Sequence, residues 1–356
     1  MILRVDPWIR KFKLPQRLDH ILPVLQKKTD WEIISYRIEP ERKLGYYFGY
    51  LLAFIATIPV LLSKKYDVLL MENPYLSFFA PFAKLRRKKV ITEYVDFYPS
   101  MLIRLRKERL LRYMVATVVC RVYSRFSDKI INESRTTYLT LKQWKVPEHK
   151  LMVIPVAIDT ELFEFSSDRR EKIRKSLGID KDEFVIGYTG KMPEYYNLEA
   201  IVDAIDQAKS LKAKKVRGLF IGDGPLRSKL EQSFQKLNIT AIFTGTRPRE
   251  ELPGYYSAMD LFIFPLNALA IKIGELLSMG TPLIAVQGMI ADWIEDGVNG
   301  YLSRSSKPED LSKKIDEFLS LHESQREKVS QTMREFAKEK LSLEKVASLY
   351  LQVLAS

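Results

Sequence analysis

The chain has 356 residues, 46% of them hydrophobic and 28% charged, which is typical of a globular protein with two domains and excludes a disordered chain. The single cysteine, Cys120, excludes a disulfide framework or a cysteine metal cluster, and the three histidines are scattered without the spacing of metal ligands. The net charge of +13 lies in the first half, because residues 1–160 hold 29 Lys and Arg against 15 Asp and Glu, whereas the rest hold 28 against 29.

Apolar runs of strand length alternate with helical periods along the whole chain. They lie at residues 2–5, 31–36, 68–71, 89–93, 129–132 and 151–154, and again at 184–189, 216–221, 241–243, 261–264 and 283–286. Near-continuous apolar strands between helices indicate parallel sheets that are covered on both faces. We therefore predict an α/β fold of two doubly wound, Rossmann-like domains facing each other across a cleft. The predicted domains are residues 1–163 and 164–340, with a last helix, 341–356, that returns to the first domain.

One stretch of the first half, residues 45–63, has no charged residue and is long enough for a transmembrane helix. It lies between two predicted strands, and a spanning helix would place those strands on opposite sides of a bilayer. Positive charge also flanks both of its ends, which gives no orientation. We favour a buried crossover helix, with a helix that dips into lipid as the main alternative.

The positive charge of the first half peaks at residues 84–89 and 101–126. The second segment mixes cations with Leu, Met, Val and Tyr at helical spacing, and its first five cations are Arg104, Arg106, Lys107, Arg109 and Arg112. A basic helix with an apolar face predicts a surface for anionic lipid. Nucleic acid and a plain solvated face are the alternatives, but no nucleic-acid motif supports the former. Because the first sixteen residues lack a signal-peptide core and cysteine is scarce, we expect a cytoplasmic protein that binds the membrane peripherally.

The most informative segment is 261–302. An apolar strand leads through a short loop into a helix that carries Lys272 and Glu275, and Gly280-Thr281-Pro282 ends that helix before the next strand. Lys272 and Glu275 are three residues apart, so their side chains lie on one face of the helix. Both residues also lie in the first turns of the helix, where the helix dipole and the free N–H groups favour an anion. A cation for a diphosphate and a carboxylate for a sugar diol, at the carboxyl end of a parallel strand, predict a nucleotide-sugar site.

Six segments of the chain resemble, in order, the motifs of the GT-B glycosyltransferases, most closely glycosyltransferase family 4. The segments are IPVAIDTELF at 154–163, IGYTGKM with NLE at 186–199, LFIGDGPLR at 219–227, FTG to AMD at 243–260, ELLSMGTP at 275–282 and DGVNGYL at 296–302. The resemblance covers residues 125–356 well and residues 1–124 only loosely. It implies a retaining glycosyltransferase that uses a nucleotide-diphosphate sugar without a metal or other cofactor.

The resemblance also implies roles for individual residues. Lys191 and Lys272 would contact the donor diphosphate, and Glu275 would hold the ribose hydroxyls. Thr246 and Arg247 would lie near the base, and Asp96 would contact the acceptor or the donor sugar. The remaining implied donor-binding residues are Gly190, Gly222, Gly224 and Asn267.

The chain departs from the family pattern at two positions of the site. Tyr196 occupies the place of a lysine that pairs with the cation at Lys191, and Asn267 replaces the first of two glutamates of which Glu275 is the second. Lys272 would have to compensate for the lost cation. A D-x-D pattern at Asp180 and Asp182 precedes a strand, so we interpret it as a loop and not as a metal site.

We therefore predict a glycosyltransferase of the hexosyltransferase type, acting on a lipid-linked or membrane-proximal glycan acceptor. The neutral second domain would hold the donor, and the basic first domain would hold the acceptor and the lipid. Two alternatives remain. A non-catalytic GT-B subunit that docks a partner is favoured by Tyr196 and Asn267. A nucleotide-sugar 2-epimerase shares the fold, but the scarcity of histidine counts against it.

Overall fold

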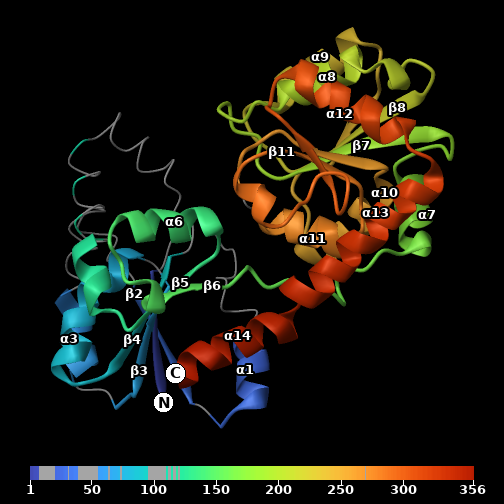
Figure 1. Ribbon diagram of the computed structural model, residues 1–356. Helices are drawn as coiled ribbons and strands as arrows, with labels where there is room; N and C mark the ends of the chain where they lie inside the picture. Colours follow the sequence, from blue (N-terminus) through green and yellow to red (C-terminus); the bar gives the residue numbers. More distant parts are fainter. Residues whose placement is uncertain are drawn as a thin grey trace. The chain divides into compact units, whose positions relative to one another are not determined.

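The computed structural model describes residues 1–7, 21–30, 32–38, 55–62, 65–72, 74–94, 121–268 and 270–356, together with positions 110, 114 and 118. It divides the chain into two compact units (Figure 1). Unit 1 comprises Met1–Ala157 and Leu343–Ser356, and unit 2 comprises Ile158–Ser342. The sequence-based boundary at residue 163 is six residues too late, because the fully buried ring of Phe163 packs beside Tyr256, 6.2 Å away, in unit 2.

Unit 1 is built on a six-stranded parallel sheet in the order β2-β1-β3-β4-β5-β6. Its strands are β1 (Ile2–Pro7), β2 (Ile33–Ile38), β3 (Val68–Met71), β4 (Lys89–Tyr94), β5 (Lys129–Asn132) and β6 (Leu151–Val153). Its helices are α1 (Leu22–Lys28), η3 (Pro74–Phe79), α3 (Ala80–Leu85), η4 (Tyr123–Phe126), α6 (Arg135–Gln143), η5 (Glu148–Lys150) and α14 (Leu343–Ala355). Residues 55–62 are also helical.

The alternation of side chains along the strands divides the core of unit 1 between the two faces of the sheet. Ile2, Leu70 and Ile91 pack on one face with Leu25 of α1 and Tyr350 of α14. On the opposite face, neighbouring strand residues such as Leu3 and Leu69 pack with α3 and the helical residues 55–62. Figure 1 shows α14 beside α1, so the last helix completes a core that begins with the first strand.

Unit 2 has a second six-stranded parallel sheet, in the order β12-β11-β10-β7-β8-β9. Its strands are β7 (Glu183–Thr189), β8 (Lys215–Ile221), β9 (Ala241–Phe243), β10 (Leu261–Phe264), β11 (Leu283–Val286) and β12 (Tyr301–Ser303). Its helices are α7 (Ser167–Ser176), α8 (Glu199–Gln207), η6 (Lys209–Leu211), α9 (Arg227–Lys236), η7 (Arg249–Glu251), α10 (Leu252–Ala258), α11 (Ile271–Met279), η8 (Met289–Asp292), α12 (Pro308–Ser320), α13 (Glu323–Phe336) and the π-helical η9 (Ala337–Leu341).

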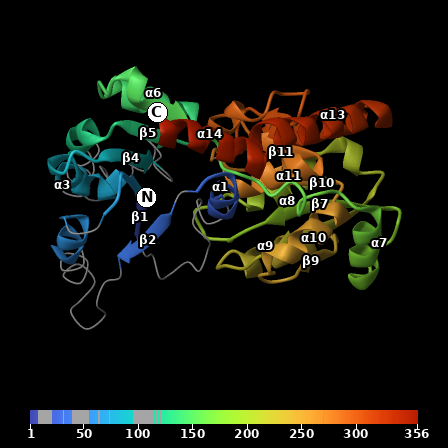
Figure 2. The ribbon, with the colours of Figure 1, turned by 90° about the horizontal axis from the view of Figure 1, so that it is seen from below.

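Helices cover both faces of this second sheet. Figure 1 shows α8, α9 and α12 on one side and α7, α10, α11 and α13 on the other, and Figure 2 shows the same elements turned by 90°. The strand order reverses at β7, which has β8 on one side and β10 on the other. The prediction of two doubly wound parallel sheets is confirmed, and all eleven predicted strands are present. The twelfth, β12, was missed because only three residues of a glycine-rich segment form it.

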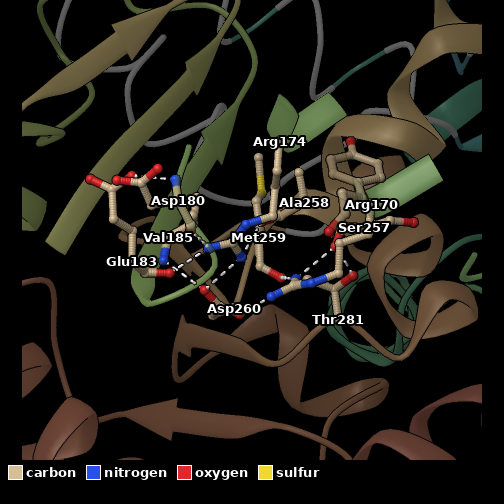
Figure 3. A network of polar contacts seen from close by, with 11 residues as sticks. Arg170, Arg174, Asp180, Glu183, Val185, Ser257, Ala258, Met259, Asp260 and Thr281 are labelled. Carbon is tan, nitrogen blue, oxygen red and sulfur yellow. Dashed lines mark hydrogen bonds and ion pairs between the residues drawn. The ribbon is translucent and has the colours of Figure 1, made fainter. Parts of the chain in front are cut away.

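A polar network fixes the amino ends of β7 and β10 (Figure 3). Asp260, directly before β10, accepts from Arg170 at 2.5 Å, from Arg174 at 3.3 Å and from the Val185 backbone N–H at 2.7 Å. Arg170 also donates to the carbonyls of Ser257 and Met259. The network therefore connects helix α7 to both central strands of the sheet.

The D-x-D pattern lies at the same amino end of the sheet. Asp182 forms an exposed ion pair with Lys215 at 2.5 Å, and the Asp180 backbone N–H donates to Glu183 at 2.8 Å. Among the described residues, no group of three or more histidines, cysteines, aspartates or glutamates is arranged to hold a metal ion. Nor does any described helix have the length and apolar character needed to cross a bilayer.

Candidate active site

The candidate site lies where the strand order of unit 2 reverses. Strands β7 and β10 are parallel neighbours, and the helices that follow them lie on opposite faces of the sheet. A crevice forms at such a switch point at the carboxyl ends of the strands, and it is the usual ligand site of an open α/β sheet. The loops that follow β7, β8, β9 and β10, together with helix α11 after β10, hold every residue of unit 2 that the sequence predicted for donor binding.

Glycines join the first three of these loops through their backbones. Gly190 donates its N–H to Ile221 O at 2.8 Å, and Gly222 donates to Gly245 O at 2.8 Å. Gly222 and Gly224 have φ of +122° and +157°, and a Cβ at either would lie 2.1 Å from Gly190 O or 2.5 Å from Met192 O. Only glycine permits this approach. The observed contacts of Gly222 and Gly224 are thus to the neighbouring loop, and their contact with a nucleotide remains a prediction.

Lys272 lies in the first turn of α11, as predicted. Its ammonium donates to Thr189 O and lies 5.0 Å from the ring centre of Tyr188 and 5.5 Å from that of Phe264. A Cβ on Gly190 would reach within 2.2 Å of this ammonium, so the glycine makes room for it. Burial lowers the pKa of Lys272 to about 8, although the nearby carboxylate of Glu275 raises it.

Glu275 lies one turn further along α11 and is only 2% exposed. Its Oε1 accepts from Nε of Arg249 at 3.1 Å and from a terminal guanidinium nitrogen of Arg249 at 3.0 Å. Its Oε2 accepts from the hydroxyl of Tyr256 at 3.2 Å. Burial raises the pKa of Glu275, and Arg249, Tyr256 and Lys272 oppose that rise. Helix α11 ends at Gly280 with φ of +66°, as the Gly-Thr-Pro sequence predicted.

Three other predicted residues of unit 2, Lys191, Thr246 and Arg247, lie in the loops after β7 and β9. The side chain of Lys191 is exposed, and its carbonyl accepts from the Tyr188 hydroxyl at 3.0 Å. Thr246 and Arg247 are exposed in the loop after β9, where the guanidinium of Arg247 lies 5.7 Å from the ring centre of Tyr255.

Asn267, at the position of the family's first glutamate, bridges two loops. Its Oδ1 accepts from the Met289 N–H at 2.9 Å, next to Gly288, where a Cβ would lie 2.0 Å from the same oxygen. The loop after β10 is thereby attached to the loop after β11. In this arrangement the asparagine amide oxygen is used within the chain, and its contact with a donor sugar remains a prediction.

The predicted residues of unit 1 cannot be placed. Asp96 and the lipid-binding candidates Arg104, Arg106, Lys107, Arg109 and Arg112 lie outside the described residues. In unit 2, sequence reasoning missed Arg249 as a partner of Glu275, because the two residues are 26 positions apart and lie on different elements. Tyr256 was noted only as part of a family motif, without a role.

Comparison with known proteins places unit 2 in a family. Residues 169–338 match the family model described as Glycosyl transferases group 1, so these residues belong to that family, and the predicted resemblance is confirmed at this level. The narrower assignment to family 4 remains a prediction.

Two curated relatives match about half of the chain. The sulfoquinovosyl transferase SQD2 of Arabidopsis thaliana is 31% identical over 185 residues, which are 50% of this chain and 34% of that protein. The D-inositol 3-phosphate glycosyltransferase of Corynebacterium kroppenstedtii is 30% identical over 177 residues, 46% of this chain and 39% of that protein. The chain thus spans well under half the length of these relatives.

Solved structures match the whole chain in fold. HepE of Anabaena, in complex with UDP, has a TM-score of 0.78 and 18% identity, with 99% of each chain covered. Sucrose-phosphate synthase of Thermosynechococcus elongatus has a TM-score of 0.75 and 16% identity, again with 99% of each chain covered. At these identities the likeness shows the fold, and the predicted GT-B architecture is confirmed.

Proposed function

We propose that the chain is a glycosyltransferase that moves a sugar from a nucleotide-diphosphate donor to a lipid-linked or membrane-proximal glycan acceptor. The observation that carries this proposal is the pair Lys272 and Glu275 in the first turns of α11, at the carboxyl end of β10. The group 1 family match of residues 169–338 gives this pair its context.

Lys272 is suited to a departing nucleoside diphosphate. Among the residues that the structure describes, its one hydrogen-bond acceptor is Thr189 O, which leaves ammonium N–H groups for phosphate oxygens. The N-cap position of α11, Ala270, supplies no side-chain cap, so the start of this helix would also favour an anion. Positive groups preset where negative charge develops contribute most to reactions of this kind.

We propose that the transfer is metal-independent and retains the anomeric configuration. Lys272, Lys191 and the first turn of α11 would balance the charge of the leaving diphosphate in place of a divalent cation. Attack by the acceptor would then occur on the face that the diphosphate leaves. The role of Asp96 on the acceptor side remains part of this proposal.

Donor binding tests the proposal directly. UDP-, GDP- and ADP-sugars are compared by thermal shift and by donor hydrolysis, with and without EDTA, on wild type, Glu275→Ala and Glu275→Gln. A UDP-sugar is the first choice, because the structure of HepE is in complex with UDP. We expect stabilisation by one donor that EDTA leaves unchanged and that is smaller in both variants. If no donor stabilises the wild type, the chain is better described as a non-catalytic GT-B subunit.

Unit 1 supports the membrane part of the proposal, because two basic segments far apart in the sequence meet there. Helix α3 contacts η4, and Lys84 of α3 forms an ion pair with Asp128, 2.5 Å away and just after η4. Large apolar side chains are exposed on these elements, with Leu85 exposed by 77% and Phe126 by 40%. Further exposed apolar side chains recur every four residues just before η4, at Leu110, Met114, Val118 and Val122.

Exposed apolar side chains among cations are the composition that binds an anionic lipid surface, since both insertion and charge attraction contribute. We propose that this region attaches the protein peripherally to the cytoplasmic face of a membrane. The test is co-sedimentation with phosphatidylcholine vesicles that contain or lack phosphatidylglycerol. We expect binding only to the anionic vesicles, at least tenfold weaker in the double variant Leu85→Asp, Phe126→Asp.

The control for that test is Val298→Asp, which changes an exposed apolar residue of unit 2. It should bind the vesicles as wild type does. Equal loss in the control and the double variant, or competition by RNA at equal charge concentration, would contradict the lipid assignment.

A further inference from the structure

The carboxylate of Glu275 has a fixed orientation before any donor arrives. Arg249 donates twice to Oε1, at 3.1 and 3.0 Å, and Tyr256 donates once to Oε2, at 3.2 Å. A carboxylate that is 97% or more buried requires such partners to remain ionised. Three donors on two oxygens define the plane of the group. They leave about one of its roughly four acceptor positions open, on Oε2.

The two hydrogen-bond donors, Arg249 and Tyr256, both lie beside the aromatic ring of Phe163. The guanidinium of Arg249 lies 5.2 Å from the ring centre of Phe163, and the ring of Tyr256 lies 6.2 Å from it. Phe163 is fully buried, and its carbonyl accepts from Ser278 of α11 at 2.7 Å. The segment that opens unit 2 and the elements η7, α10 and α11 therefore meet at the carboxylate, and neither of its donors, Arg249 and Tyr256, is an exposed side chain.

We propose that Arg249 is a positioning residue that holds the Glu275 carboxylate with Oε2 open to a ribose hydroxyl of the nucleotide donor. This inference rests on the proposed function and on the ribose contact that the family resemblance implies for Glu275. Arg249 acts through Glu275 and does not itself need to touch the donor.

Charge gives Arg249 a second effect on the same carboxylate. Burial raises the pKa of Glu275, and the positive charge of Arg249 is the largest influence that lowers it. A carboxyl group without this cation would hold its proton at higher pH, and a protonated group accepts fewer hydrogen bonds. Loss of Arg249 should therefore move the acid side of the nucleotide-affinity profile to higher pH. A purely structural residue would leave that profile in place.

The test uses the full chain and three nucleotides: UDP, 2′-deoxy-UDP and 3′-deoxy-UDP, or the corresponding nucleotides of whichever base the wild type binds. Calorimetry gives the ratio of Kd values between the deoxynucleotide that binds more weakly and its parent. We expect a ratio of at least tenfold in wild type and of no more than about threefold in Glu275→Gln. In Arg249→Gln the Kd ratio should fall to the same extent, and in the double variant Arg249→Gln, Glu275→Gln it should fall no further.

Two further variants keep the test decisive. Arg249→Lys retains the positive charge and a hydrogen-bond donor. It should therefore recover part of the Kd ratio, and its nucleotide affinity should fall at the same acidic pH as in wild type. Arg304→Gln removes an exposed arginine of the same unit, 83% exposed and paired with Asp310, and should keep the full ratio. If Arg249→Gln folds poorly, Arg249→Lys and Tyr256→Phe supply the comparison.

The outcomes separate this inference from the proposed function. A wild type that binds no nucleotide overturns both. A wild type that discriminates, a Glu275→Gln that does not, and an Arg249→Gln that still does would overturn the role of Arg249 alone. Full discrimination in Glu275→Gln would overturn the ribose contact, and the positioning role with it, while leaving donor binding intact.

Discussion

Strands β7 and β10 carry a charged cluster at each of their two ends, and the clusters differ in how their hydrogen bonds are used. At the amino ends, Asp260 accepts from Arg170, from Arg174 and from a backbone N–H, and the two arginines also donate to backbone carbonyls (Figure 3). At the carboxyl ends, Lys272 has one described acceptor and Glu275 retains an open acceptor position.

The difference indicates which cluster serves the fold and which serves a ligand. At the amino ends, most donors and acceptors of the charged groups are matched within the chain, although Arg174 Nε is buried without a partner among the described residues. These charges fix the packing of α7 on the sheet and have little left to offer a ligand. Charges with hydrogen bonds to spare, at the end of the sheet where glycine loops bring backbone N–H groups together, are prepared for an anion. Substitutions at the amino ends should therefore change mainly the stability of the fold, and substitutions at the carboxyl ends should change mainly the binding and use of the sugar donor.

The largest effect is expected from Lys272→Met. Removing the ammonium should lower kcat/KM for the donor about 10²–10³-fold, the loss typical when a preset positive group is taken from the leaving diphosphate. The melting temperature should not fall, because the variant also removes a partly buried charge. Steady-state kinetics and a thermal melt check both statements. Activity within threefold of wild type would show that the two ends of the strands do not differ in this way.

The opposite pattern is expected from Asp260→Ala. Two guanidinium groups and the Val185 N–H would lose an acceptor in a partly buried place, so unfolding should become easier by about 2–3 kcal/mol. Well below the melting temperature, the Kd for the donor should stay within about twofold of wild type. Urea unfolding and calorimetry measure the two quantities. A donor Kd that weakens as much as in Lys272→Met would remove the distinction between the clusters.

The fold was predictable because strand patterns are local. The segments Leu261–Phe264 and Leu283–Val286 can each be recognised as a strand from their own four apolar residues. In the same way, Gly280 marks the end of α11. Helix α11 was predicted together with Lys272 and Glu275, since spacing along one helix sets which side chains share a face. The short strand β12 was not predicted, because pairing with β11 and not its own pattern defines it.

The partners of the site residues could not be predicted in the same way. Arg249 reaches Glu275 from another element, and no spacing in the sequence brings a position in the loop after β9 to a helix 26 residues later. The glycines after β8 were noticed, but their contacts with the loop after β7 depend on the sheet bringing both loops together. Long-range pairs of this kind follow from the fold and are invisible in a single sequence.

A smaller effect is expected from Gly222→Ala, with Gly178→Ala as its matched control. Both residues have positive φ, +122° and +63°, but a Cβ at Gly222 would meet Gly190 O at 2.1 Å, and a Cβ at Gly178 meets nothing within 4 Å. Gly178→Ala should lose about 1 kcal/mol of stability to backbone strain, and Gly222→Ala should lose more, because its Cβ also meets a backbone oxygen. Only Gly222→Ala should also weaken donor binding, by about tenfold, since it displaces the loop beside Lys272. Equal donor affinity in the two variants would contradict a role for the glycine loops in the site.

The smallest effect concerns pH and applies to the carboxyl end alone. The pKa of Lys272 is lowered to about 8 by burial, so the ammonium is charged at neutral pH and loses its proton as pH rises through that value. Donor affinity, which uses the charged form, should therefore be constant below about pH 7 and fall severalfold between pH 8 and 9. Bound diphosphate stabilises the ammonium, so the complex should lose its proton at a higher pH than the free protein. In Lys272→Arg the guanidinium stays charged across this range, and the decline should disappear. A decline that persists in Lys272→Arg would have to come from another group, and the ammonium would then not be the cation that the diphosphate meets.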